Sequence, residues 1–270
     1  GITMPTTPAK NLLYRAALPI LAPRSRGQMT HHVFGHPLTS LPNYERILAK
    51  HHVFGASLLL QDGANCALCD TSTANPEHLA QENTLYRVAS ITKMATALVT
   101  LRCINNGLFS LDSEAASLLP DGEKAPALSG VTVRHLLCHT SGLRDLPILD
   151  DCLKEGKPYT ELLRQPEIRA CAPGQQLIYS NFGFGLLGCI LEQQTGLCIE
   201  PLFQEMLFRP LHMRATLDAS TLNEAEIMPI TRVLPYRAGQ ELRVTALGRH
   251  PLQKLNPLCH YGHTAGAMYT

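Results

Sequence analysis

The pattern of apolar and polar positions first becomes regular at residues 53–60, a run of β-favouring apolar residues followed by Asp62-Gly63. An Asp-Gly pair after such a run favours a tight hairpin turn, because glycine adopts the left-handed backbone that the turn requires. Residues 66–70 then predict the returning strand, and the polar stretch 71–83 predicts a loop. The first element expected from the pattern is therefore a β-hairpin.

The segment before the hairpin carries a weaker pattern. Residues 1–40 are rich in Pro, Thr, Arg and His and show no sustained periodicity, so they predict an irregular N-terminal arm. Residues 42–50 place apolar side chains on one side of an expected helix. The main domain is accordingly expected to span residues 41–270.

A helical pattern runs from Val88 to Gly107, where an Asn-Asn-Gly sequence is typical of a helix C-cap. The apolar residues at helical spacing within it are Met94, Ala95, Ala97, Leu98, Leu101 and Ile104. Further along, Thr132 is a favourable N-cap for a short helix. Residues 182–195 predict another apolar helix, which stops at Gly196.

The last part of the chain is less regular. Residues 201–208 continue helically up to an Arg-Pro pair, and residues 227–247 contain short β-rich runs such as 241–245. The outline predicted from the pattern is a hairpin, then a mostly helical body, then an irregular end.

Length and composition are those of an ordinary globular protein. The 270 residues suit one large domain or two intimate subdomains. A formal net charge of +1 gives no electrostatic case for nucleic acid or an anionic membrane as a partner. No apolar run reaches the ~18–20 residues that would predict a transmembrane segment.

The cysteines favour a cytoplasmic location over secretion. There are nine, an odd number, and they lack the dense spacing of a disulfide scaffold, so reduced thiols are expected. Cys66 and Cys69 form a C-x-x-C pair, but no second pair follows at the spacing that a zinc site needs.

Ser90 and Lys93 carry the first candidate chemistry. They lie near the start of the predicted helix, where residues at i and i+3 share one face. A serine hydroxyl needs a nearby base to become a nucleophile, and burial disfavours the charged form of a lysine, which makes its neutral amine available as that base. The alternative is an N-capping serine with a solvent-facing lysine. Small and apolar neighbours on both sides favour partial burial of Lys93.

Tyr179 and Asn181 form a second candidate, between a Pro-Gly turn and the second apolar helix. A phenolic oxygen near a lysine can relay protons, and an asparagine amide can offer a donor and an acceptor to a substrate. The alternative interpretation is an ordinary loop in which Ser180 or Asn181 caps the following helix.

Residues 86–93 (Tyr-Arg-Val-Ala-Ser-Ile-Thr-Lys) resemble the first motif of the β-lactamase-related serine hydrolases. That family includes penicillin-binding proteins, D-alanyl-D-alanine carboxypeptidases, class C β-lactamases and esterases. The resemblance continues in the same order through residues 106–112, 133–143 (Val-Arg-His-Leu-Leu-Cys-His-Thr-Ser-Gly-Leu), 173–196 and 209–213. It covers about residues 40–270, and the ordered conjunction is specific where each motif alone is weak.

The resemblance implies an α+β fold of the β-lactamase/transpeptidase type, with an antiparallel sheet, flanking helices and a mostly helical subdomain. It also implies that Ser90 is the acylated nucleophile and Lys93 its base or proton acceptor. Tyr179 corresponds to the general acid/base, and Asn181 to a substrate-positioning residue. No metal or organic cofactor is implied.

The chain departs from the family pattern at its third motif, a Lys-Thr-Gly or His-x-Gly element on a strand beside the nucleophile. The local candidate, residues 262–266 (Gly-His-Thr-Ala-Gly), more closely resembles the segment that precedes this motif in the family. His263 is therefore interpreted as structural, as are His139 and Ser141 in a turn that supports the site.

We accordingly expect the C-terminal strands of the sheet to be missing, and the chain to be a fragment of a longer enzyme or a truncated, impaired homologue. One of those strands provides an oxyanion donor in the family, and the loss of such a donor can cost ~100–1000-fold in rate.

The sequence thus predicts a serine hydrolase that acts through a Ser90 acyl-enzyme on a peptide, β-lactam or ester carbonyl. Two alternatives stay open. One is an acyltransferase, in which the acyl group passes to an amine or alcohol, and the other is a non-catalytic or impaired homologue that acts as a binding protein. The expected partner is a small-molecule or peptide substrate, and the sequence sets no oligomeric state.

Overall fold

The computed structural model describes residues 28–34, 47, 55–63, 65–72, 83–228, 230–234, 237–241 and 261–270. The chain divides into two compact units. Unit 1 consists of Gly1–Leu85 and Asn223–Arg243, and unit 2 consists of Tyr86–Leu222 and Val244–Thr270. All the residues predicted to carry chemistry belong to unit 2.

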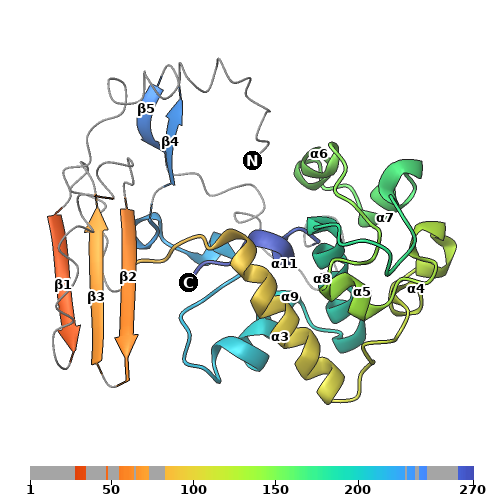
Figure 1. Ribbon diagram of the computed structural model, residues 1–270, viewed down its shortest axis with the longest axis horizontal. Helices are drawn as coiled ribbons and strands as arrows, with labels where there is room; N and C mark the ends of the chain where they lie inside the picture. The colour runs from red at the N-terminus through yellow and green to blue at the C-terminus, as the bar shows by residue number, and fades with distance from the viewer. Residues whose placement is uncertain are drawn as a thin grey trace. The chain divides into compact units, whose positions relative to one another are not determined.

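Unit 1 contains two antiparallel sheets (Figure 1). The larger sheet has the strands β1 (Gln28–Phe34), β2 (Gly55–Asp62) and β3 (Asn65–Ser72), in the order β1-β3-β2. In the smaller sheet, β4 (Ile230–Leu234) pairs with β5 (Arg237–Glu241). A short 3-10 helix, η8 (Glu224–Glu226), also belongs to this unit.

The predicted hairpin is confirmed. Strands β2 and β3 pair antiparallel, and the last pair in the register is Asp62 with Asn65, so the loop between them has two residues. Gly63 in this loop has a φ of 57°, the left-handed conformation that the tight turn requires.

The prediction of an irregular arm over residues 1–40 is wrong for residues 28–34. These residues form β1, which pairs along its whole length with β3. The physical reason is that a strand takes its backbone hydrogen bonds from a partner far along the chain, and this tertiary context overrides a weak local pattern. The helix expected over 42–50 lies outside the described residues apart from Ile47, which is helical, and the run 241–245 lies outside them beyond position 241.

Unit 2 is mainly helical (Figure 1). Its two longest helices are α3 (Thr92–Asn105), which follows the 3-10 turn η2 (Ala89–Ile91), and α8 (Asn181–Thr195). The shorter segments are α4 (Ala115–Leu118), η3 (Gly122–Lys124), η4 (Pro126–Leu128), α5 (Val133–Leu137), α6 (Leu149–Lys154), α7 (Tyr159–Leu163), η5 (Pro166–Ile168), α9 (Ile199–Phe203), η6 (Gln204–Phe208), η7 (Ala219–Thr221) and α11 (His263–Gly266). The helices predicted from Val88, after Thr132, over 182–195 and over 201–208 are confirmed.

Helix α8 is the buried centre of unit 2. Every residue from Phe182 to Glu192 is buried, as expected for a helix that is apolar on all sides, and α3, α5 and α11 all contact it (Figure 1). Both ends follow the signals in the sequence. The Oγ of Ser180 accepts a hydrogen bond from the N–H of Gly183, and Gly196 ends the helix with a φ of 68°.

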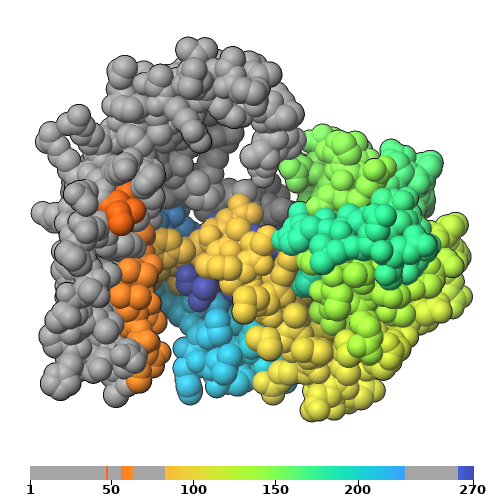
Figure 2. Space-filling model, in the orientation of Figure 1, coloured from red at the N-terminus to blue at the C-terminus, as the bar shows by residue number. Residues whose placement is uncertain are grey.

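The large apolar residues of α3 face outward, so its amphipathic pattern predicts the helix correctly but not its buried face. Met94 is 67% exposed and Leu98 and Leu101 are also exposed, and the helix is visible along the surface in Figure 2. The buried residues are small or polar: Thr92, Lys93, Ala95, Thr96, Val99, Thr100 and Cys103. Burial of the three threonines is tolerated because each hydroxyl donates to a backbone carbonyl.

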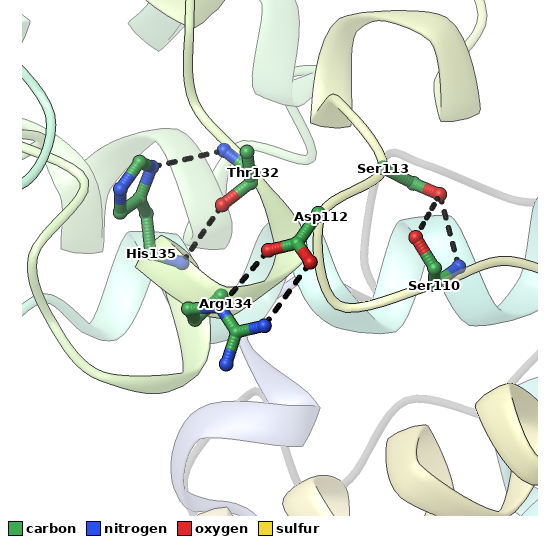
Figure 3. A network of polar contacts seen from close by, with 6 residues as sticks. All are labelled: Ser110, Asp112, Ser113, Thr132, Arg134 and His135. Atoms are coloured by element: carbon green, nitrogen blue, oxygen red, sulfur yellow. Dashed lines mark hydrogen bonds and ion pairs between the residues drawn. The ribbon is translucent and has the colours of Figure 1, made fainter.

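A polar network ties the turn after α3 to the start of α5 (Figure 3). The guanidinium of Arg134 donates to both carboxylate oxygens of Asp112, at 3.0 and 3.1 Å. This contact lowers the pKa of the Asp112 carboxyl below its usual range. Thr132 caps α5 as predicted, since its hydroxyl accepts from the N–H of His135 and its own N–H donates to the His135 ring.

Residues 261–270 return to the beginning of unit 2. The backbones of Tyr86 and Thr270 exchange two hydrogen bonds, at 2.9 and 3.1 Å, and the N–H of Val88 donates to the carbonyl of Met268 at 3.0 Å. Within this segment α11 contacts both α3 and α8. The segment therefore joins the two long helices, which carry Lys93 and Asn181.

Gly185→Ala tests this packing. A Cβ at Gly185 would lie 1.7 Å from the carbonyl oxygen of Tyr261, a backbone atom that cannot move alone. We expect the variant to lower the free energy of unfolding by about 1–3 kcal/mol or more, as overpacking does, measured by chemical denaturation. Gly183→Ala is the matched control on the same helix, because its Cβ would meet nothing closer than 3.5 Å, and it should stay within about 1 kcal/mol of the parent chain. Equal losses from both variants would contradict the packing.

Candidate active site

Ser90 lies in η2, directly before α3, and is exposed. The preceding residue, Ala89, has a φ of 47°, a left-handed conformation that residues other than glycine rarely adopt. Thr92 holds this turn, since its hydroxyl donates to the carbonyl of Ala89 and accepts from the N–H of Met268. A strained turn held from both sides thus presents the Ser90 hydroxyl at the amino end of the helix.

Lys93 follows on the same helix and is 7% exposed, which confirms the burial expected from its neighbours. Its Nζ has three polar contacts: the Oγ of Ser90 at 3.2 Å, the Oδ1 of Asn181 at 2.8 Å and the carbonyl oxygen of Ala265 at 2.7 Å. The three partners come from η2, α8 and α11, which are far apart in the chain. Across the part of the chain that the structure describes, no carboxylate forms an ion pair with this amine.

These three contacts match the bonding capacity of an amine. An ammonium group has three N–H donors, whereas a neutral amine has two donors and one lone pair. The Asn181 Oδ1 and the Ala265 carbonyl can only accept, while the Ser90 hydroxyl can donate or accept. In the neutral amine, with its two N–H groups bonded to Asn181 and Ala265, the lone pair would face Ser90, and a proton could pass from Oγ to Nζ while those two hydrogen bonds stay in place.

Tyr179 brings a second oxygen to Ser90. Its phenol donates to the Oγ of Ser90 at 2.8 Å, and the Nζ of Lys93 lies 4.8 Å from the centre of its ring. The side chain is half exposed, so the phenol is open to a substrate. The structure thus brings together Ser90, Lys93 and Tyr179, the three residues to which the sequence assigns catalytic roles.

His139 stacks on Tyr179, with 4.4 Å between the ring centres. Its Nδ1 accepts from the N–H of Ser180 at 3.1 Å, and its carbonyl accepts from the N–H of Ile178 at 2.7 Å. His139 therefore fixes the chain on both sides of Tyr179, which agrees with its interpretation as a supporting residue. It takes a φ of 57° to do so.

Asn181 is occupied on both sides of its amide. The Oδ1 accepts from Lys93, and the Nδ2 donates to the Oδ2 of Asp145 at 2.6 Å. The role in substrate positioning that the sequence assigns to Asn181 stays a prediction. What the geometry adds is a contact that orients the lysine amine.

Asp145 is a site residue that sequence reasoning did not identify. Its carboxylate accepts four hydrogen bonds, from the hydroxyl of Ser180, the N–H groups of Asn181 and Phe182, and the Nδ2 of Asn181. The only feature of the sequence that could have identified Asp145 is its position just after the motif segment 133–143. An acidic residue as distant as Asp145, 36 positions before Asn181, can stabilise the start of a helix only where the chain folds back onto it, which the sequence does not reveal.

His263 is fully buried on α11. Residues 263–266 form a helix, whereas the third motif of the family lies on a strand, so these residues fit the preceding segment better, as interpreted. The part of this helix that reaches the site is the backbone carbonyl of Ala265. A backbone carbonyl has no side-chain motif, so the sequence could not identify it.

The described cysteines are reduced, and the most deeply buried ones are poor nucleophiles. Those with described side chains are free: Cys103, Cys138, Cys152, Cys171, Cys189 and Cys198. Burial raises the pKa of the Cys103 thiol to about 11 and that of Cys198 to about 12, so both stay protonated near neutral pH. Within the described ranges, no group of three or more His, Cys, Asp or Glu side chains could hold a metal ion.

Two further features of unit 2 lie apart from this chemistry. A cavity of about 680 Å³ lies between residues 121–127 and 160–169, and neither Ser90 nor Lys93 lines it. No single helix among the described residues is long and apolar enough to cross a membrane, although α8 and residues 199–208, a pair bent by 85°, together meet that length and composition.

A family model described as "Beta-lactamase" matches residues 43–254, which is more than half of the chain. The chain belongs to the beta-lactamase family. The resemblance that the sequence motifs suggest is thereby confirmed.

Curated relatives of this beta-lactamase family chain include a transferase, a penicillin-binding protein and a peptidase. Monacolin J acid methylbutanoyltransferase from Aspergillus terreus is 32% identical over 157 residues (48% of this chain and 37% of that protein). Penicillin-binding protein 4 from Amycolatopsis lactamdurans is 28% identical over 225 residues (74% and 58%). D-alanyl-D-alanine-carboxypeptidase/endopeptidase AmpH from Escherichia coli is 30% identical over 146 residues (50% and 37%). The chain thus matches 37–58% of the length of these relatives, which support an acyl-transfer function on a serine-hydrolase fold.

Solved structures of the family show the same fold. The crystal structure of SurE superposes with a TM-score of 0.62 at 21% identity, over 97% of this chain and 52% of that one. A class C β-lactamase superposes with a TM-score of 0.61 at 20% identity, over 84% and 59%. The predicted α+β fold of the β-lactamase/transpeptidase type is confirmed.

The stability of this beta-lactamase family chain should fall when His139 becomes protonated. Burial, together with the positive charge of Lys93, lowers the pKa of His139 against an opposing effect of Asp145. The unfolded chain, with an ordinary histidine pKa of about 6.5, therefore binds a proton more readily than the folded chain. The stability associated with neutral His139 is present above about pH 6.5 and is lost as the pH falls below it.

His139→Asn tests this expectation by urea unfolding between about pH 7 and pH 5. Asparagine tolerates a positive φ and can retain an acceptor for the N–H of Ser180, but it does not titrate. The variant should lose less stability on acidification than the parent chain. Equal losses would show that protonation of His139 does not oppose folding.

Proposed function

We propose that this protein is a serine hydrolase that forms an ester between Ser90 and the acyl group of its substrate. The observation that carries the proposal is the position of the Ser90 Oγ, 3.2 Å from the Nζ of Lys93 and 2.8 Å from the phenol of Tyr179. A hydroxyl within hydrogen-bond reach of two groups that can take and return a proton has what nucleophilic acyl transfer requires.

In the first step, the Oγ of Ser90 attacks the carbonyl carbon of the substrate. The O–C bond forms as the hydroxyl proton moves to the Nζ of Lys93, whose N–H groups stay bonded to Asn181 and Ala265. Negative charge then develops on the carbonyl oxygen. We assign its stabilisation to the backbone N–H of Ser90 and to the positive amino end of α3.

In the second step, Tyr179 gives its phenolic proton to the leaving nitrogen or oxygen, and the bond between this atom and the acyl carbon breaks. The phenolate recovers a proton from the ammonium of Lys93, since both groups face the Oγ of Ser90. Water then attacks the Ser90 ester by the reverse proton path. The products are a free acid and the restored serine.

The substrate that we propose is a small molecule or peptide with an amide, β-lactam or ester carbonyl. Relatives named as a carboxypeptidase/endopeptidase and as a beta-lactamase support this class. Because both Ser90 and Tyr179 are exposed, the nucleophile and the proton donor are open on the same side to such a substrate.

A second candidate is an acyltransferase, in which an alcohol or amine replaces water in the last step. It is favoured by relatives named as acyltransferases, including one from Monascus pilosus that is 31% identical over 49% of this chain. Added alcohol or amine acceptors would then give transfer products that mass spectrometry can detect. Free acid as the sole product would favour the hydrolase.

Intact-mass labelling tests the role of Ser90. The full chain should form a one-to-one adduct with a fluorophosphonate, and also with a penicillin if β-lactams enter the site, whereas Ser90→Ala should form neither. Met94→Ala is the matched control on the exposed side of the helix and should label like the parent chain. An adduct on Ser90→Ala would contradict the assignment, and a parent chain without any adduct would favour a binding protein that keeps the fold.

Tyr179→Phe tests the proton path to the leaving group. Phenylalanine keeps the ring that stacks on His139 and removes only the hydroxyl. Acylation by an amide substrate, whose leaving nitrogen needs a proton, should slow by ~100- to 10,000-fold. Acylation by a nitrophenyl ester, whose leaving group departs as an anion, should slow much less. Equal losses on the two substrates, measured in single-turnover experiments, would rule out Tyr179 as the acid.

A further inference from the structure

We infer that Asp145 is a positioning residue for the proposed reaction, because through Asn181 it fixes the direction of the Lys93 lone pair. This inference rests on the proposed function. The Oδ2 of Asp145 lies 2.6 Å from the Nδ2 of Asn181, whose Oδ1 lies 2.8 Å from the Nζ of Lys93. All four hydrogen bonds of the carboxylate go to residues 180–182, so it reaches the amine only through Asn181.

The direction of the Lys93 lone pair depends on which end of the Asn181 amide faces the lysine. An asparagine amide can present either its oxygen or its nitrogen to a neighbour. A carboxylate only accepts, so Asp145 requires the Nδ2 on its own side, and the Oδ1 must then face Lys93. With the amide reversed, an N–H donor would face the amine. The lone pair of Lys93 would then turn to Asn181 and away from Ser90.

The surroundings hold this carboxylate rigidly. Its Oδ1 accepts from the hydroxyl of Ser180 at 3.2 Å and from the N–H of Phe182 at 2.9 Å, and its Oδ2 also accepts from the N–H of Asn181 at 3.0 Å. These backbone N–H groups are the first of α8, a helix of 15 residues whose positive end stabilises an anion. The carboxylate therefore also caps α8, and an experiment must separate this structural effect from positioning.

The loop that carries Asp145 is itself anchored. Leu143 forms a β-bridge with Arg169, and the N–H of Arg144 donates to the carbonyl of Ile168 at 3.0 Å. The direction that Asp145 imposes on Asn181 is therefore set by fixed backbone on both sides.

Asp145→Asn is the sharpest test, because it keeps the shape and removes the charge and one acceptor. Either orientation of the new amide places an NH₂ group against an N–H donor of residues 180–182. Asn181 should then lose its fixed orientation. The readout is the rate of phosphonylation of Ser90 by a fluorophosphonate, followed by intact mass. In this reaction the Oγ–P bond forms, the P–F bond breaks, fluoride leaves and the serine proton passes to Lys93.

The expected result has two parts. The rate should fall on the order of 10- to 100-fold, as misplacement of a catalytic group does. In an Asn181→Ala background the same substitution should lower the rate no further, because Asp145 reaches the amine only through Asn181.

Thr132→Ala is the matched control. It removes the N-cap hydroxyl of α5 and should lower the melting temperature while leaving the rate per folded chain as in the parent chain. An Asp145→Asn rate lowered only by the unfolded fraction, or lowered equally with and without the Asn181 side chain, would overturn the positioning role and leave the proposed function standing. A parent chain that forms no adduct would overturn the proposed function and this inference with it.

Discussion

Unit 2 depends on the hydrogen bonds that replace water around the buried amine of Lys93, which no carboxylate of the described residues contacts directly. Removing a charged or polar group from water costs on the order of several kcal/mol unless other polar atoms replace the water. For Lys93 those atoms are the amide oxygen of Asn181 and the carbonyl oxygen of Ala265. Both are in place only when α3, α8 and α11 pack together. The packing of these three helices therefore also fixes the positions of the groups around Lys93.

Close packing of these three helices explains an otherwise unusual distribution of residues. The buried side of α3 carries threonines and alanine, while its large apolar residues face outward. On α8, Gly185 and Gly188 lie where a Cβ would meet Tyr261 and Thr264 of the returning segment. Small residues allow the backbones to approach closely enough for a carbonyl to reach a lysine on the neighbouring helix. Larger side chains would separate the helices and leave the amine without its acceptors.

The site also concentrates backbone strain. Ala89, which precedes Ser90, and His139, which stacks on Tyr179, both have positive φ although neither is glycine. Such conformations cost on the order of 1–3 kcal/mol each and persist only where the surroundings hold them. Hydrogen bonds from Thr92, Ser180 and Ile178 supply that support. The residues around Ser90 are thus held in place before any substrate arrives, which is the arrangement that the proposed proton transfers require.

The sequence by itself determined the features whose signals are local. The glycine of the hairpin turn, the Thr132 cap and the stop at Gly196 each act on adjacent backbone, and ordered motifs indicated the family and the residues that meet at Ser90. Only the tertiary structure decided the pairing of β1, the buried face of α3, and the parts played by Asp145 and Ala265. The physical reason is the same in each case. The partner of a backbone carbonyl, of a strand or of a carboxylate is set by contacts between residues far apart in the chain, and such contacts leave no periodic or capping signal in the sequence.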